Sequence, residues 1–421
     1  MTLISGPPRR SGLAVLPPQA QAQMPEVARK GEERAGLNRC RTHKYLVPEV
    51  IFGVGTVGEV GNVLRRKGGC RPFIVTDPGV IEAGWVDHAM PFLDDAGLSW
   101  ELWHGVTPNP KDYEVDSGFE VFRESGCDVV MALGGGSCID AAKAIAMLST
   151  NPGNVLDYAG IDKVQAPLPP MVMVPSTGGT GADVSQFCVI TDTANRLKAT
   201  IAGRSLVPDV SITDPRLLTT MPDDLSANTA LDALAHAIEA YVSKAADFLS
   251  DVHALAAIRG ISEHLLSSLA DPKDLVAREG IARASLQAGM AFSNALLGAT
   301  HAISHQIGGA LDLPHGLLNA ILLPHVIRFN SETNPERYVD VSAALGLGEE
   351  FSSPRDAADA VASHISLLSD KIGIPPGLAA IGVKHADIDV FAVNALNDAY
   401  ITTNPRPVSE DDVRRICVSA L

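Results

Sequence analysis

Histidine and aspartate side chains gather in the second half of the chain at spacings that suit metal binding. Seven of the twelve histidines lie between residues 236 and 325. Asp232 and His236 are one helical turn apart in an apolar stretch, and His301 and His305 repeat that spacing further along. Such pairs share one face of a helix. An inward charge in an apolar helix is costly unless something pairs with it, so both pairs are candidates for function.

A third histidine completes the pattern. His315 follows in the segment LPHG, and two such helices plus this residue can supply three imidazoles and a carboxylate to one divalent metal. Glu239 is an alternative ligand on the first helix, although its spacing makes it less central. His253, His264 and His325 have no partner in register, so we expect them to be ordinary core or surface residues.

A second chemical motif is a glycine-rich turn between a predicted strand and a predicted helix. The apolar run at residues 128–133 ends in GGGS (134–137). Glycines let backbone N–H groups approach a ligand closely, and the N-terminus of the following helix favours negative charge. We expect Ser137 to cap this helix, with Asp140 completing a capping box. The loop is neither a G-x-G-x-x-G fingerprint nor a P-loop, so it indicates either a pyrophosphate site or a plain tight turn.

Two further features could hold the rest of a dinucleotide. Asp77 follows the strand candidate at residues 71–76. A carboxylate in this place can accept the ribose hydroxyls of NAD and would repel the 2′-phosphate of NADP, whereas the competing interpretation is an ordinary Asp-Pro-Gly turn. A second glycine loop at residues 177–181 carries the hydroxyls of Thr177 and Thr180 and could wrap the other side of the same ligand.

The elements that must position these residues change character along the chain. Strand candidates at 71–76, 128–133, 171–174 and 207–214 alternate with helical stretches and end in glycine or proline turns, which predicts a parallel α/β sheet. After about residue 220, helical spacing dominates, at residues 225–243, 250–269, 275–293 and 356–371. We therefore predict a dinucleotide-binding α/β domain at 41–214 and an all-helical metal-binding domain at 215–421.

Composition narrows the class of protein. The chain has 421 residues, is 46% hydrophobic and carries a net charge of -16, which suits two folded domains. The acidic balance argues against nucleic acid or a membrane surface as partner, and no apolar run approaches the ~18–20 residues of a membrane span. Six scattered cysteines without a C-x-x-C pair fit reduced thiols in a cytoplasmic protein.

Residues 1–40 hold five prolines, six basic and three acidic side chains, which predicts a disordered or dispensable extension.

Together these segments resemble the iron-containing (group III) alcohol dehydrogenases. The resemblance runs from about residue 44 to the C-terminus. It implies a dehydroquinate synthase-like architecture, with an α/β dinucleotide-binding domain and an all-α domain enclosing the active site. The matching stretches are GGGSCIDAAKAIA (134–146), PSTGGTGADVSQFCVITD (175–192), LDALAHAIEAYVS (231–243), AFSNALLGATHAISHQIGGALDLPHGLLNAILLPH (291–325) and NPRPV (404–408).

The resemblance also assigns roles to single residues. It makes His305 a proton relay that does not ligate the metal, and it gives the metal ligands as Asp232, His236, His301 and His315. The chain departs from the family pattern conservatively at Ala182-Asp183 and Ala230, with every ligand position filled. The cofactor positions that match are Asp77, Asn109, Gly135, Gly136, Ser137, Asp140, Thr177, Thr180, Val189 and Lys198.

The implied function is an NAD-dependent and Fe²⁺-dependent alcohol dehydrogenase that interconverts a primary alcohol and its aldehyde by hydride transfer. The same ligands would also hold Zn²⁺, because an N/O site binds zinc more tightly than Fe²⁺. The family forms homodimers and larger homo-oligomers. Two alternatives stay open: a zinc-dependent relative such as a glycerol dehydrogenase, and a regulatory protein with low turnover. The segment KYLVPEVIFG (44–53) is similar to an alcohol-dehydrogenase-like subgroup linked to regulation of ethanol oxidation.

Overall fold

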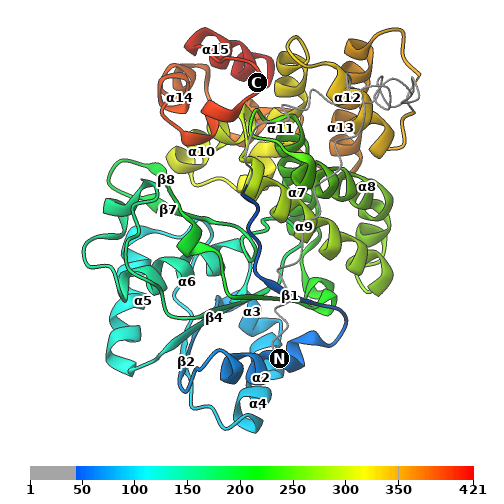
Figure 1. The fold of residues 1–421 in the computed structure, drawn as a ribbon. Coiled ribbons are helices and arrows are strands. Elements are labelled where there is room, and N and C mark those ends of the chain that lie inside the picture. Colours follow the sequence, from blue (N-terminus) through cyan, green and yellow to red (C-terminus); the bar gives the residue numbers. More distant parts are fainter. Residues whose placement is uncertain (1–43, 349) are drawn as a thin grey trace, which may run out of the picture. The chain divides into compact units, whose positions relative to one another are not determined.

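The structure, a computed structural model, describes residues 44–348 and 350–421. Residues Tyr45–Leu421 form one compact unit, and Figure 1 traces its strands and helices in chain order. The extension that we predicted at residues 1–40 lies outside the described residues.

A sheet of six parallel strands occupies the first half of this unit, in the order β1-β9-β6-β4-β2-β3. The four strand candidates from the sequence are confirmed as β2, β4, β6 and β9. In the register of the sheet, Gly134 at the end of one central strand opposes Pro175 at the end of its neighbour. The two glycine loops therefore leave the sheet side by side at its carboxyl edge, where α/β sheets bind ligands. The strands are β1 (Glu49–Phe52), β2 (Pro72–Val75), β3 (Glu101–Trp103), β4 (Val129–Gly134), β6 (Met171–Pro175) and β9 (Val210–Thr213).

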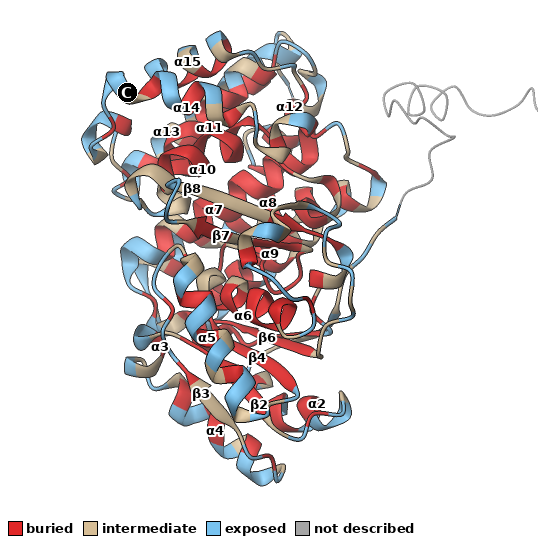
Figure 2. Cartoon of the chain, turned by 90° about the vertical axis from the view of Figure 1, so that its left-hand side faces the viewer, coloured by how far each residue is buried: buried red, intermediate tan, exposed pale blue. Residues whose placement is uncertain are grey.

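Helices cover both faces of this sheet because alternate strand residues point to opposite sides. Ile74 and Met131 pack with α2 and α4 on one face, whereas Phe73 and Val130 pack with α5 and α6 on the other. Figure 2 shows the buried strands between partly exposed helices. The helices of this half are α2 (Val60–Arg66), α3 (Pro78–Glu82), α4 (Trp85–Asp95), α5 (Asp112–Ser125) and α6 (Gly136–Leu148).

A second, three-stranded sheet was not predicted. Its order is β5-β8-β7, formed by β5 (Gly160–Ile161), β7 (Phe187–Asp192) and β8 (Leu197–Ala202), with the last two strands antiparallel. Four of the six residues of β8 are only half-buried, so the strand lacks a clear apolar pattern. The hairpin matters for function because it carries Val189 and Lys198.

The second half of the chain is helical, and the four helices predicted there are confirmed as α7, α8, α9 and α13. Every residue of α7 from Thr229 to Val242 is buried, so this helix forms the centre of the helical half. None of the described helices combines the length and the apolar character that a membrane crossing would require. The helices are α7 (Asp223–Val242), α8 (Phe248–Ala270), α9 (Leu275–Ala295), α10 (Ala299–Leu311), α11 (His315–Asn330), α12 (Glu336–Ala344), α13 (Pro354–Lys371), α14 (Ile388–Ala395) and α15 (Glu410–Ser419).

Short 3-10 helices join these elements. The fold class predicted from the sequence, a parallel α/β half followed by an all-helical half, is confirmed, while the domain boundary at 214/215 stays a prediction. The 3-10 helices are η2 (Thr56–Glu59), η3 (Val155–Tyr158), η4 (Arg204–Leu206), η5 (Pro215–Thr220), η6 (Leu378–Ile381), η7 (His385–Asp387) and η8 (Ala399–Thr403).

Candidate active site

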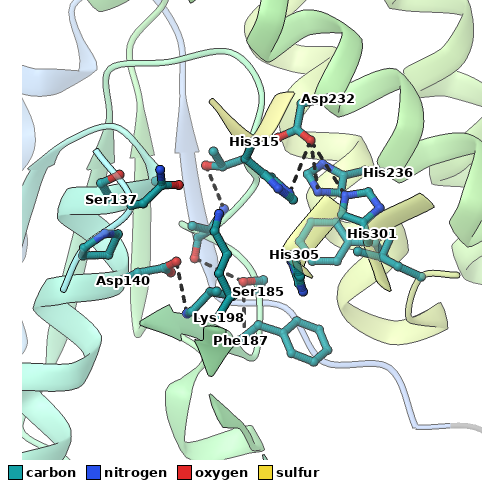
Figure 3. Close-up of a pocket in the computed structure, with 18 of the residues that line it drawn as sticks. Ser137, Asp140, Ser185, Phe187, Lys198, Asp232, His236, His301, His305 and His315 are labelled. Atoms are coloured by element: carbon teal, nitrogen blue, oxygen red, sulfur yellow. Dashed lines mark hydrogen bonds and ion pairs between the residues drawn. The ribbon is translucent and has the colours of Figure 1, made fainter. Parts of the chain in front are cut away.

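One cavity is lined by residues from both halves of the compact unit. Its lining combines apolar walls with a few polar and charged side chains, as small-molecule sites do. Figure 3 shows Ser137 and Asp140 on one side, Asp232, His236 and His301 on the other, and Lys198 between them. All the predicted metal ligands and His305 line it, together with these predicted cofactor residues: Asn109, Gly136, Ser137, Asp140, Thr180, Val189 and Lys198.

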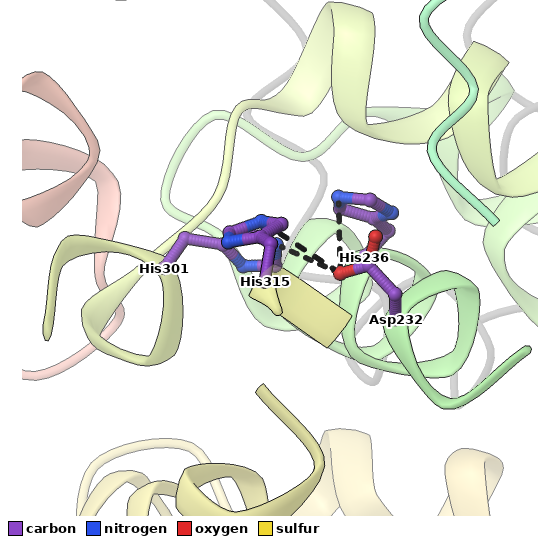
Figure 4. Close-up of side chains that lie close together, drawn as sticks. All are labelled: Asp232, His236, His301 and His315. Carbon is purple, nitrogen blue, oxygen red and sulfur yellow. Dashed lines mark ion pairs between the residues drawn. The ribbon is translucent and has the colours of Figure 1, made fainter. Parts of the chain in front are cut away.

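Four side chains at this cavity converge into one group. Asp232 and His236 come from adjacent turns of α7, His301 from α10, and His315 is the first residue of α11. One ligand atom from each residue lies within 4.8 Å of all the others. The Nε2 atoms of His236, His301 and His315 are 3.8, 3.7 and 3.8 Å from the same oxygen, Asp232 Oδ1, as Figure 4 shows.

The charges of this cluster favour a bound cation. Burial alone would raise the pKa of Asp232, but the imidazoles of His236, His315 and His301 hold it far below its ordinary value. Burial lowers the pKa of His236 to about 4 and that of His315 well below its ordinary value. Burial lowers the pKa of His301 as well, but its hydrogen bonds to Asp232 and Glu239 outweigh burial and raise that pKa to about 9. At neutral pH the cluster thus offers an ionised carboxylate and the neutral imidazoles of His236 and His315, and a bound metal would displace the proton from His301 Nε2. Three imidazole nitrogens and one carboxylate are a donor set that suits both Fe²⁺ and Zn²⁺.

Two further buried residues contact the cluster. Asn319, four residues after His315 on α11, was missed by sequence reasoning; its Nδ2 donates to Asp232 Oδ1 at 2.7 Å and lies 2.9 Å from His301 Nε2 and 3.1 Å from His315 Nε2. Its second hydrogen can serve only one of the two imidazole nitrogens. Its helical spacing from His315 was the available signal. Glu239, the alternative ligand, lies behind His301 and contacts Nδ1 at 2.6 Å.

His305 lines the cavity without joining the ligand group. Its Nδ1 lies 2.9 Å from Asp398 Oδ2, and Asp398 Oδ1 accepts from the backbone N–H of Tyr400 at 3.0 Å. Burial lowers the pKa of His305 although Asp398 raises it. With Nδ1 held by a fixed carboxylate, Nε2 is the nitrogen left to exchange a proton. Asp398 lies 93 residues further along the chain, so spacing alone could not pair it with His305.

The predicted cap of the glycine-loop helix is wrong. Helix α6 begins at Gly136, and its N-cap is the extended Gly135, at φ -74 and ψ -173, which offers no side-chain cap. A Cβ at Gly136 would lie 2.6 Å from Thr180 Cγ2, so close contact of the two loops requires glycine where the helix starts. Ser137 is free to line the cavity, and the uncapped first turn suits a phosphate group.

Two half-buried ionisable groups, Asp140 and Lys198, face the cavity beside this turn. Asp140 Oδ2 accepts from the backbone N–H of Val189 at 3.2 Å. Burial raises the pKa of Asp140 to about 6, against the effect of Lys143 and Lys198. Burial lowers the pKa of Lys198 to about 8, although neighbouring carboxylates raise it. At neutral pH Lys198 is therefore mostly a cation, available to a polar or anionic ligand group.

Three predicted cofactor residues, Asp77, Gly135 and Thr177, do not line this cavity. Asp77 caps α3: its Oδ1 accepts from the backbone N–H of Val80 at 3.0 Å, and its Oδ2 accepts from Cys138 Sγ at 3.0 Å. It lies at the carboxyl end of β2, beside the loop after β4. Asp77 thus caps a helix at the Asp-Pro-Gly turn, which agrees with the turn interpretation. Its ribose-binding role stays a prediction.

An apolar wall closes the cavity next to the histidines. Phe187 from β7 stacks on Phe292 from α9 at 6.0 Å between ring centroids, and meets Tyr400 edge-on at 5.5 Å. Phe292 also stacks on the ring of His236 at 4.4 Å. Leu297 completes the lining on this side. These packed rings make this side of the cavity apolar.

Comparison with known proteins finds similar chains along most of this one. Residues 48–215 match the family described as iron-containing alcohol dehydrogenase, and residues 226–421 match the C-terminal part of the Fe-containing alcohol dehydrogenase family. A 1,3-propanediol dehydrogenase from Citrobacter freundii is 43% identical over 379 residues, covering 89% of this chain and 98% of that protein. An NAD-dependent methanol dehydrogenase from Bacillus methanolicus is 37% identical, covering 90% and 100%. A crystal structure of a 1,3-propanediol oxidoreductase superposes with a TM-score of 0.88 at 42% identity, covering 90% of this chain and 100% of that one.

Proposed function

This chain belongs to the iron-containing alcohol dehydrogenase family, and we propose that it uses NAD and Fe²⁺ to interconvert a short primary alcohol and its aldehyde. The observation that carries the proposal is one cavity that joins the ligand group of Asp232, His236, His301 and His315 to the uncapped start of α6. Relatives named for 1,3-propanediol and for methanol support a short alcohol, as does the apolar wall.

The four ligands would hold the metal, and the rest of the cavity would orient the alcohol. A divalent metal supplies Lewis acidity that lowers the pKa of an alcohol. The ionised Asp232 contributes the negative charge that favours a cation there. Phe187 and Phe292 exclude water from the side of the cavity beside His236, which strengthens electrostatic interactions within it.

His305 would move the proton. Its Nδ1 is engaged by Asp398, so Nε2 accepts the alcohol proton during oxidation and returns it during aldehyde reduction. The carboxylate of Asp398 fixes the ring and stabilises the charge that the ring gains, as a paired carboxylate does for a general base. The nearby Lys198 lines the same cavity and would contact polar groups of the cofactor.

NAD would supply the hydride acceptor, held by the two glycine loops. The first turn of α6 and Ser137 face the cavity, where a pyrophosphate would meet backbone N–H groups and the positive end of the helix. Asp77 lies at the neighbouring strand end. Its carboxylate would accept the ribose hydroxyls of NAD and repel the 2′-phosphate of NADP.

This role for Asp77 gives a testable preference. Asp77→Asn keeps an N-cap acceptor for Val80 but removes the negative charge. We expect the ratio of kcat/KM for NAD over NADP to fall by about tenfold or more, equivalent to about 1.4 kcal/mol. Initial rates with each cofactor, at one alcohol concentration, would measure it. The matched control is Asp95→Asn, an exposed aspartate of α4, and an unchanged ratio in Asp77→Asn would remove Asp77 from cofactor selection.

The direct test of the proposed function is turnover by the purified chain and its loss on metal removal. Protein supplied anaerobically with Fe²⁺ should oxidise short primary alcohols with NAD through many turnovers. Chelation should stop the reaction, and added Fe²⁺ should restore it. Restoration by Zn²⁺ alone would favour the zinc-dependent alternative. Absence of steady turnover across a panel from methanol to hexanol and 1,3-propanediol would contradict the proposal and favour a regulatory protein.

A further inference from the structure

Glu239 is a fully buried carboxylate with no substrate or cofactor role in the proposed reaction. It lies on α7, three residues after His236, and its side chain is 3% exposed. Its Oε2 is 2.6 Å from His301 Nδ1, so it contacts the one ligand-group histidine that comes from α10. A buried carboxylate is expensive unless it is well paired, which makes its partners informative.

The start of α10 supplies those partners. Glu239 Oε1 accepts from the backbone N–H of Thr300 at 2.7 Å, and Oε2 accepts from the backbone N–H of Gly298 at 3.3 Å. Asn404 Oδ1 accepts from the N–H between them, that of Ala299, at 3.0 Å. The N-cap residue of α10, Gly298, supplies no side-chain cap of its own. Glu239 and Asn404, which come from distant parts of the chain, therefore cap this helix.

Close packing holds this arrangement in place. A Cβ at Gly298 would lie 2.7 Å from Asn404 Oδ1 and 3.0 Å from Glu239 Oε1. Asn404 itself exchanges two hydrogen bonds with the buried Asn330, at 3.0 and 2.8 Å. Asn404 is the first residue of the NPRPV motif (404–408). Through this side chain, the motif thus caps α10, the helix that carries His301. Glu239 cannot swing toward the ligand group without losing two backbone partners.

The hydrogen bonds also decide which nitrogen of His301 carries the proton. A carboxylate that already accepts from two backbone N–H groups can only accept again, so Nδ1 of His301 must donate. On the other side of the ring, His301 Nε2 lies 2.9 Å from Asn319 Nδ2 and 3.7 Å from Asp232 Oδ1. With one proton fixed on Nδ1, the lone pair that the neutral ring can give to a metal is the one on Nε2. This is the nitrogen that faces Asp232 and belongs to the ligand group.

We propose that Glu239 is a positioning residue that fixes the Nδ1–H tautomer and the orientation of His301, so that Nε2 is directed to the metal. The inference rests on the metal site of the proposed function. Partners of this kind orient metal ligands, and their loss typically weakens metal affinity about 10–100-fold. Glu239 acts through His301 and does not itself bind the metal.

Glu239→Gln tests the hydrogen-bond direction with almost no change in shape. The glutamine must keep an oxygen toward Thr300, the shorter backbone contact, which places its NH₂ group against His301 Nδ1. That group would donate to Nδ1 and move the histidine proton to Nε2, where it blocks ligation. Glu239→Asp remains an anionic acceptor and should preserve the tautomer. The control is Asp214→Asn, another fully buried carboxylate, which accepts from three backbone N–H groups, those of Gly55, Val57 and Arg216, and pairs with the Arg216 side chain.

The experiment measures Zn²⁺ affinity of each full-length variant by competition with a chromophoric chelator, with thermal unfolding recorded in parallel. We expect Glu239→Gln to bind Zn²⁺ about 10–100-fold more weakly than the wild type, with Glu239→Asp closer to the wild type and Asp214→Asn unchanged. Should the glutamine variant fail to fold, a folded aspartate variant that retains near wild-type affinity supports the proposal, and one that loses 100-fold overturns it.

Two results separate this inference from the proposed function. Wild-type affinity in folded Glu239→Gln, or an equal loss in Asp214→Asn, would overturn the role of Glu239 and leave the metal site standing. A wild-type chain that binds no Zn²⁺ would overturn the metal site and the inference together.

Discussion

Alanine in place of His301 is expected to abolish stoichiometric metal binding and to lower alcohol oxidation at least about a thousandfold. Metal Lewis acidity contributes several kcal/mol to catalysis, and each 1.36 kcal/mol is a factor of about ten in rate. The alanine variant removes one of the three imidazoles that surround Asp232 and leaves Glu239 without its histidine partner. Metal per chain, by elemental analysis, and NADH absorbance together measure the effect.

Its control is His325→Ala. His325 bonds to Ser419 at 2.9 Å and lies outside the ligand group, so this variant should keep both metal and activity. Because His301→Ala uncovers buried carboxylates, we expect a lower melting temperature as well, and the assay is run below it. Wild-type turnover in a metal-free His301→Ala preparation would contradict the metal-dependent mechanism.

The second large effect is expected at His305, with the opposite outcome for the metal. His305→Ala should lower kcat about 10²–10⁴-fold, the usual contribution of a general acid–base group, while retaining the wild-type metal content. The physical reason is that His305 reaches the cavity but directs Nδ1 to Asp398 instead of to the ligand group. Steady-state kinetics and elemental analysis on the same preparation measure both quantities.

Asp398→Asn provides the intermediate case for His305. It keeps a side chain of the same size next to Nδ1 and an acceptor for Tyr400, but it loses the charge that stabilises a protonated ring. We expect a smaller loss of kcat than for His305→Ala, with metal retained. Loss of metal in His305→Ala would instead identify His305 as a ligand and contradict its role as a proton relay.

Much of the architecture was predictable because it depends on local patterns. Buried strands such as 128–133 are short apolar runs that end in glycine, and helices such as 275–293 repeat apolar residues at helical spacing. The β7–β8 hairpin was missed because four of the six residues of β8 are only half-buried, so this strand has no clear apolar pattern. The start of α6 was misplaced by two residues, with Ser137 expected as the cap where Gly135 is observed. The contact between Gly136 and Thr180 joins two loops, which a local capping rule does not include.

The sequence by itself determined which residues could do chemistry. The helical period places Asp232 and His236 on one face, and likewise His301 and His305, whatever the rest of the chain does. Only the tertiary structure decided what each of these residues meets. His301 and His305 share one face, yet one faces Asp232 and Glu239 and the other faces Asp398.

The physical reason is that local spacing sets the direction of a side chain along its own helix but not the helix that packs opposite. Glu239 shows the same limit. Its spacing from Asp232 allowed a role as a ligand, but the start of α10, 59 to 62 residues further along, engages its carboxylate instead. The histidine and carboxylate side chains of the site were therefore recognisable from the sequence. Their separation into a ligand group, a proton relay and a positioning carboxylate depends on how α7, α10 and the C-terminal segment pack together.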